Sequence, residues 1–140
     1  MTQTLKPLLL STMPQKAKQM DKPRSKQAQD YPTVITDLPE ADISFKGITA
    51  WILQSEKRQL VFFEMQRTAV VPEHSHSYPQ WGMLIEGEMK LTINGKTRLC
   101  HKGDEYLIPA NAKHHATFQT KTRVIDLFSE KTRYKAKANK

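Results

Sequence analysis

The most informative segment of this chain is Pro72–Gln80, which reads PEHSHSYPQ. It holds two histidines separated by one residue, His74 and His76, and it ends on Gln80. Residues i and i+2 of a strand point to the same face, so the two imidazoles can reach one metal ion together. The amide oxygen of Gln80 is a candidate for a further, neutral ligand. A His-x-His pair alone is a weak signal, because surface strands often carry histidines.

A second histidine pair, His114-His115, ends the stretch Gly103–His115, which reads GDEYLIPANAKHH. One of the two can complete a metal site from a neighbouring strand, although both could also belong to an ordinary loop. Imidazole nitrogens suit zinc, iron, nickel, copper and manganese. Three histidines and an amide leave coordination positions open for water or substrate, as catalytic sites require. Their neutral shell also leaves more positive charge on the metal than a carboxylate ligand would.

The sequence around these pairs has the period of β-structure and no long helical period. Short runs rich in β-branched and aromatic residues are separated by turn residues, of which Asn94-Gly95 is the clearest hairpin signal. This pattern predicts one all-β domain, a sandwich or a barrel. The expected strands are Ile43–Lys46, Thr49–Leu53, Leu60–Met65, Ala69–Val71, Trp81–Glu86, Met89–Ile93, Lys96–Cys100, Glu105–Ile108, His115–Gln119 and Arg123–Phe128.

Taken in order, the two stretches resemble the two sequence motifs of the cupins. The first motif has the form G-x5-H-x-H-x3-4-E-x6-G, and the second has the form G-x5-P-x-G-x2-H-x3-N. The matching positions in this chain are His74, His76, Gln80 and Gly87, then Gly103, Pro109, Asn111 and His114. The departures are Thr68 for the first Gly, Gln80 for Glu, Asn111 for Gly and Phe118 for Asn. Asn is the next residue after Gly to accept a left-handed turn, so Asn111 is compatible with the motif.

This resemblance implies a cupin fold, a double-stranded β-helix or jelly-roll barrel. It implies the metal ligands His74, His76, Gln80 and His114, with His115 pointing to the other side of its strand. The cofactor would be one divalent transition metal: zinc, nickel, iron or manganese. Cupins of this size commonly pair through outer strands, so the resemblance also implies a homodimer.

Glutamine at position 80 narrows the resemblance to a set of small single-domain cupins. They include the polyketide cyclases, the enzymes that open unsaturated uronates during pectin breakdown, and many members with no assigned reaction. The run Asp126–Ser129 is similar to the last strand of the uronate-opening enzymes, although Arg133 follows one residue later than in their pattern. By this resemblance Asp126 moves a proton, and Arg133, or alternatively Arg123, holds a substrate carboxylate. From the sequence alone, a strand carboxylate paired with a lysine is slightly favoured for Asp126, and the resemblance makes the two interpretations equal.

The expected function is therefore that of a metal-dependent isomerase or lyase acting on a small oxyacid, such as an unsaturated sugar acid. Two alternatives stay open. One is an iron-dependent cupin dioxygenase, against which the neutral Gln80 argues mildly. The other is a non-catalytic module that binds a metal or a small ligand. No helix-turn-helix pattern occurs in the first 30 residues, which argues against a transcription factor.

Charge divides the 140-residue chain into three parts. Residues 1–30 carry six Lys or Arg against two Asp, residues 129–140 carry five against one Glu, and residues 31–128 carry eleven of each sign. We therefore expect a neutral barrel at 31–128 between two flexible basic tails, with no specific nucleic-acid site. No apolar run is long enough for a membrane span, and the single cysteine, Cys100, excludes an intrachain disulfide. These features predict a cytoplasmic protein.

Overall fold

The computed structural model of the protein describes residues 30–138. The chain divides into two compact units, residues 1–31 and residues 32–140, and the strands of the described residues lie in the second. The N-terminal tail expected at residues 1–30 lies outside the described residues except for Asp30. In the described part of the chain the one helix is α2, Thr33–Thr36, and it is too short to cross a membrane.

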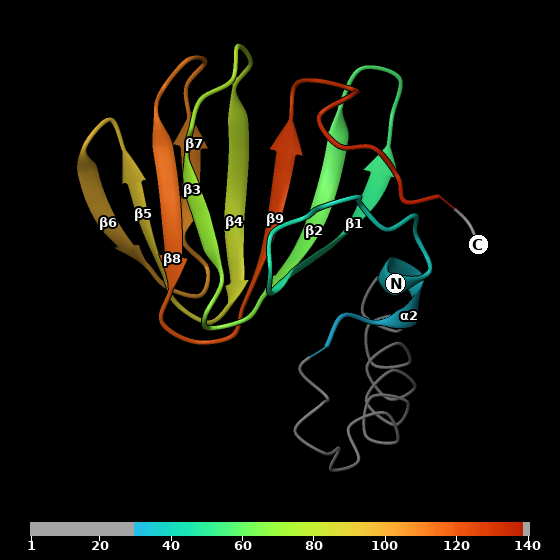
Figure 1. Cartoon of the computed structure of the whole chain (residues 1–140), viewed down its shortest axis with the longest axis horizontal. Helices are drawn as coiled ribbons and strands as arrows, with labels where there is room; N and C mark the ends of the chain where they lie inside the picture. Colours follow the sequence, from blue (N-terminus) through green and yellow to red (C-terminus); the bar gives the residue numbers. More distant parts are fainter. Residues whose placement is uncertain (1–29, 139–140) are drawn as a thin grey trace, which may run out of the picture. The chain divides into compact units, whose positions relative to one another are not determined.

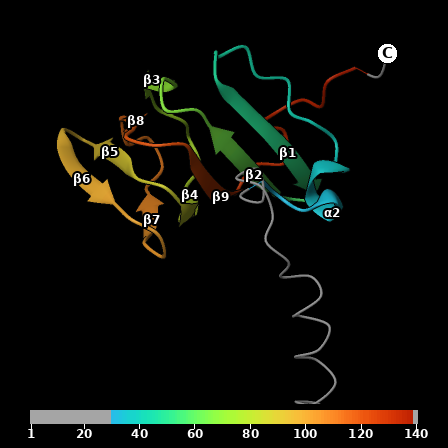
Figure 2. The ribbon, with the colours of Figure 1, turned by 90° about the horizontal axis from the view of Figure 1, so that it is seen from below.

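Nine antiparallel strands form two sheets, as the all-β prediction required (Figure 1). The five-stranded sheet has the order β1-β2-β9-β4-β7, and the four-stranded sheet has the order β3-β8-β5-β6. Figure 2 shows β1, β2 and β9 on one side of the barrel and β5, β6 and β8 on the other. The bounds are β1 Ile48–Gln54, β2 Gln59–Met65, β3 Val70–His74, β4 Gln80–Glu86, β5 Met89–Ile93, β6 Lys96–Cys100, β7 Glu105–Ile108, β8 His114–Phe118 and β9 Thr122–Phe128.

Side chains alternate between the interior and the outer face along the strands that carry the site. In β9 every second residue, beginning with Thr122, is buried, which places Asp126 and Phe128 inside. In β4 the buried residues are Gln80, Gly82 and Leu84, so the candidate ligand Gln80 points inward. The interior of the barrel thus holds an apolar core from both sheets together with a few polar side chains.

The turns of the barrel use the residues that the sequence pattern indicated. Gly87 follows β4 with a φ of 96°, and the β5–β6 turn places Asn94 and Gly95 at positive φ. Asn111, which stands at a motif glycine, has a φ of 67° and is therefore in the left-handed conformation that was expected of it.

One expected strand, Ile43–Lys46, was wrong. These residues form an irregular segment and a bend, followed by Gly47 at a φ of 80°. The apolar alternation of Ile43 and Phe45 has another cause: Ile43 packs against the core while Phe45 remains exposed. Beside this segment lie two isolated bridges, Ala41 with Ala136 and Glu40 with Trp51, and the amide of Asp42 donates to the carbonyl of Lys135.

The described part of the expected C-terminal tail is hydrogen-bonded to the barrel. The buried side chain of Gln59 donates from Nε2 to the carbonyl of Tyr134 at 2.9 Å, and its Oε1 accepts from the amide of Tyr134 at 2.9 Å. Farther along, the amide of Lys137 donates to the carbonyl of Glu40. These contacts bring Arg133 and Tyr134 back to the mouth of the barrel, beside β3.

Candidate metal centre

Three histidines from two neighbouring strands meet at one end of the barrel. His74 is the last residue of β3 and His114 is the first of β8, and the two face each other in the β3–β8 register. His76 lies two residues beyond β3, so the expectation that both histidines of the pair share a regular strand was wrong for His76. One ring nitrogen from each of the three lies within 4.8 Å of the others, which forms a candidate metal site.

The orientation of each imidazole is set by a hydrogen bond to the backbone. The Nδ1 atoms of His74, His76 and His114 lie 2.8, 2.7 and 2.8 Å from the carbonyl oxygens of Pro72, Tyr78 and Ala112. A carbonyl can only accept, so Nδ1 carries the proton and Nε2 is left as the ligand atom. The Nε2 atom of His114 is buried and has no hydrogen-bond partner.

Gln80 completes the set with its amide oxygen directed at the histidines. Its Nε2 donates to Oδ2 of Asp126 at 2.9 Å, which leaves Oε1 at 3.0 Å from Nε2 of His76. With Nδ1 of His76 protonated, two acceptor atoms face each other at this point. A cation bound between them would satisfy both, as it would the unpartnered nitrogen of His114. The four predicted ligands therefore fit a divalent metal ion.

Burial favours the neutral form, which a metal ligand needs, at two of the three imidazoles. It lowers the pKa of His74, and it lowers the pKa of His114 to about 4. The positive charge of Arg133 contributes in the same direction at both residues. The ring of His76 is stacked on Tyr78 with a centroid distance of 4.4 Å, which fixes its plane.

Asp126 lies next to this centre and is fully enclosed. The hydroxyl of Tyr106 donates to its Oδ1 at 2.6 Å, and Gln80 donates to its Oδ2. Burial raises the pKa of Asp126 to about 7, against the opposing effect of these two hydrogen bonds. The carboxyl can therefore hold or release a proton near neutral pH, and it has no lysine partner in the described residues.

The structure brings Arg133 to the centre and leaves Arg123 away from it. Arg133 Nη2 lies 3.4 Å from Nε2 of His74, and its guanidinium lies 4.8 Å from the ring centroid of Tyr134. Its Nε is buried without a hydrogen-bond partner. Arg123 alternates with the inward residues of β9 and pairs in register with Glu64, on the outer face. Glu64 also faces outward, where it forms an ion pair with Lys121 at 3.6 Å.

Two cavities that share part of their lining lie beside the centre. An inner cavity of about 60 Å³ reaches from His74 and His114 to Asp126. A larger cavity of about 330 Å³ at the mouth shares Phe63, Val71, His74, Arg133 and Tyr134 with the first. The inner space suits one small group, and the outer space suits the body of a small molecule.

Sequence reasoning missed two tyrosines of this site. Tyr106 is inward in β7 and pairs in register with Gly82, and its alternation with Ile108 was a signal that could have found it. Tyr134 follows the last strand, where no alternation pattern exists to place it.

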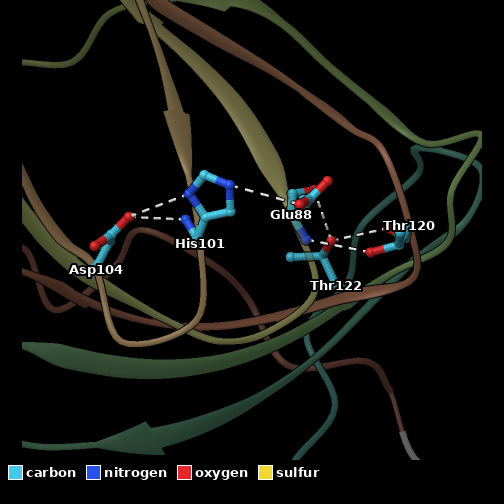
Figure 3. Close-up of polar contacts among 5 residues, drawn as sticks. All are labelled: Glu88, His101, Asp104, Thr120 and Thr122. Carbon is cyan, nitrogen blue, oxygen red and sulfur yellow. Dashed lines mark hydrogen bonds and ion pairs between the residues drawn. The ribbon is translucent and has the colours of Figure 1, made fainter.

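The remaining histidines lie apart from the centre. His115 points away from it, as expected, and its Nδ1 lies 3.9 Å from a carboxylate oxygen of Glu73. His101 forms an exposed cluster with Glu88 and Asp104, beside Thr120 and Thr122 (Figure 3). This cluster is next to Met89, whereas His114 pairs with Ile93 at the other end of β5. The two groups are therefore at opposite ends of the barrel.

Comparison with known proteins agrees with this geometry. Residues 61–128 match the cupin domain family. These residues form a cupin domain. A further search found no match among curated proteins.

Three solved structures illustrate the similarity of this chain's fold to known folds. An RmlC-like cupin from Shewanella frigidimarina is 23% identical, with a TM-score of 0.64 over 70% of this chain and 88% of that one. KdgF from Halomonas sp. is 26% identical, with a TM-score of 0.62 over 68% of this chain and 90% of that one. Salicylate 1,2-dioxygenase from Pseudoaminobacter salicylatoxidans is 14% identical, with a TM-score of 0.59 over 64% of this chain and 26% of that one. The two matches under 25% identity support the fold alone.

Proposed function

We propose that this cupin is a metal-dependent isomerase or lyase that acts on a small oxyacid. The observation that carries the proposal is the direct hydrogen bond between Gln80 and the buried carboxyl Asp126. It joins a candidate metal ligand to a group whose pKa is raised to about 7. A metal site and a proton-transfer group within one enclosed space are the parts that proton transfer beside a carbonyl requires.

The roles of the residues follow from their places. His74, His76, His114 and Gln80 would hold the metal, which when bound polarises a substrate oxygen. Asp126 takes or returns the proton, and Tyr106 orients its carboxyl through the bond to Oδ1. Arg133 holds the substrate carboxylate, because its buried Nε has no partner of its own. The guanidinium of Arg133 lies beside the candidate metal ligand His74, so it and a bound metal cation would both attract an anionic group of the substrate.

The finer form of the proposal, an unsaturated sugar acid as the substrate, is supported by the sequence resemblance at Gln80 and Asp126–Ser129. The ion stays among zinc, nickel, iron and manganese, since imidazole and amide ligands accept all of them.

The first test is metal content by mass spectrometry, on wild type purified without an affinity tag and on His76→Ala. We expect about one equivalent in wild type and a loss in the variant. His115→Ala is the matched control, because His115 faces away from the centre. Absence of metal in wild type after soaking with zinc, nickel, iron and manganese would overturn the proposal. Metal binding without turnover of any oxyacid would refute the enzymatic function and favour the alternative of a non-catalytic module that binds a metal or a small ligand.

A second candidate function is an iron-dependent dioxygenase. The three-histidine set with open positions favours it, because non-haem iron accepts such ligands. The measurement is oxygen uptake by the iron-loaded protein with catechols, flavonols or thiols. Uptake would favour this candidate, and no uptake would remove it.

We also propose that the cupin is a homodimer formed through the outer face of the five-stranded sheet. One apolar side chain from each strand lies in a single row across this face: Leu53, Leu60, Leu127, Trp81 and Leu107. The two ends of the row, Leu53 and Leu107, are 47% and 62% exposed. An apolar row across a whole sheet is unusual for a monomer surface, and a second copy is the partner that matches it without further assumptions.

A further inference from the structure

The cavity at the mouth of the barrel is bounded by a segment that belongs to no strand. Residues 42–45, together with Ile48 at the start of β1, form one wall of this space of about 330 Å³. Its other wall includes Pro72 of β3 and, beyond the last strand, Arg133 and Tyr134. The cavity therefore opens beside His74 and Arg133, where the proposed substrate carboxylate is held.

The lining of this cavity is mainly apolar. Seven of its eleven residues are aliphatic or aromatic, and Ile43, Phe45 and Ile48 come from the segment before β1 and its first residue. Phe45 is 48% exposed although it is a large aromatic side chain, so a ligand in the cavity could cover it. Burying such surface favours an apolar ligand.

The polar groups of the cavity are few. Apart from His74, Arg133 and the hydroxyl of Tyr134, they are the side chains of Asp42 and Ser44, both of which are exposed. A polyhydroxylated ligand would place several of its hydroxyls against aliphatic and aromatic carbon, where they lose hydrogen bonds to water without replacement. The carboxylate of Asp42 would also disfavour a second anionic group on the ligand.

We infer that the substrate is a monocarboxylate with an apolar body, whose carboxylate pairs with Arg133 and whose body lies against Ile43 and Phe45. This inference rests on the proposed function, because it names the substrate class of the same centre. It selects against the sugar acid that the sequence resemblance favours. It also gives a function to residues 43–45, which contribute to no strand.

The test compares the binding of two carboxylates of similar size by calorimetry, on the full chain saturated with zinc. Phenylpyruvate has an apolar body, and galacturonate carries hydroxyls. We expect phenylpyruvate to bind about tenfold more tightly, the scale on which an apolar pocket discriminates. Phe45→Ser should reduce that preference several-fold and leave galacturonate affinity unchanged. Leu99→Ser is the matched control, since Leu99 is 44% exposed and lines neither cavity.

Equal affinity for the two acids, tighter binding of galacturonate, or no binding of either would overturn the inference. So would a preference that Phe45→Ser leaves intact in a protein that still folds, as judged by its Tm. The metal assay separates this failure from that of the proposed function. A protein that binds metal and converts a sugar acid would refute the apolar substrate and keep the proposed function. Preferred binding of phenylpyruvate without turnover of any acid would support the apolar ligand and refute the proposed enzymatic function.

Discussion

Gly82 is the single residue on which the packing of the proton-transfer group depends most directly. It stands in register between Tyr106 and Asp126, and a Cβ at this position would clash with Asp126 Oδ1 and with the Tyr106 ring. We expect Gly82→Ala to lower the free energy of unfolding by about 3 kcal/mol, since the added methyl would force the Asp126 carboxyl and the Tyr106 ring out of their hydrogen-bonded arrangement. Chemical denaturation of wild type and of Gly82→Ala measures this difference in the free energy of unfolding.

The control for Gly82→Ala is Gly95→Asn, in the β5–β6 turn. A Cβ at Gly95 meets no atom within 4 Å, and Asn tolerates its positive φ of 81°. This variant should lose less than about 1 kcal/mol. Equal stability of Gly82→Ala and wild type would mean that Asp126 and Tyr106 are not held in the arrangement described.

Tyr134 gives the folded protein a pH dependence in the alkaline range. Burial raises its pKa to about 12 from a usual value of 10.0. The folded state thus keeps the phenol proton more tightly than the unfolded state does. This contribution to stability is complete below pH 10 and is lost as the pH rises towards 12. Urea unfolding at several pH values should show a steeper alkaline loss for wild type than for Tyr134→Phe.

Spectroscopy offers an independent check of the same residue. An absorbance titration of tyrosinate should show a late ionisation step near pH 12 that vanishes in Tyr134→Phe. A late step that persists in the variant would assign it to another tyrosine.

Local spacing was enough to predict some residues of the site and insufficient for others. His74, His76, Gln80 and His114 lie at or next to strand ends, where the motif spacing and the strand register place them together. The environment of Asp126 could not be read from its own strand, because its partner Tyr106 comes from β7. The position of Arg133 depends on the path of the irregular segment after β9, which strand alternation in the sequence does not predict.

Among the elements, the strands were predictable and the segments that border the mouth were not. Nine expected strands occur with ends within a few residues, because alternation and turn chemistry are local signals. The strand predicted at residues 43–46 was wrong because an alternating apolar pair is also found in a segment that covers one end of a barrel. The final segment was expected to be a tail because its composition is basic, yet it is fixed by a buried amide of β2.

The side chain amide of Gln59 holds the C-terminal segment against the barrel by hydrogen bonds. It makes two hydrogen bonds to the backbone of Tyr134 and one to Gln54 Oε1 at 2.8 Å. We expect Gln59→Leu to lower the free energy of unfolding by about 2 kcal/mol, because it leaves buried backbone groups unpaired. The segment should also become sensitive to limited proteolysis after Lys131 and Arg133, while metal content is retained.

The exposed Gln66 provides the control, and Gln66→Leu should change neither stability nor proteolysis. Unchanged protection of the segment in Gln59→Leu would show that its position does not depend on this amide. Loss of metal in Gln59→Leu would instead show that metal binding depends on the position of the C-terminal segment.

At the scale of the whole molecule, the proposed dimer face can be compared with the size of known interfaces. Same-face residues of a sheet lie about 4.8 Å apart across strands and about 6.8 Å apart along them. Five strands by four rows therefore cover about 650 Å². This is close to the ~800 Å² that each partner contributes to a stable interface. The apolar row from Leu53 to Leu107 crosses this face, and Met83 and Ile125 extend it in the next row.

If two copies associate through this face, a charge at either end of the row should separate them. Leu107→Lys and Leu53→Lys each place an ammonium group in an apolar interface, which costs several kcal/mol without a partner. We expect both variants to sediment as monomers at concentrations where wild type is a dimer. Leu99→Lys, on β6 of the other sheet, should remain dimeric. A monomeric wild type, or dimers in both interface variants, would place the contact elsewhere or remove it. Metal content should be the same in all four proteins, because the ligands face the interior while this row faces outward.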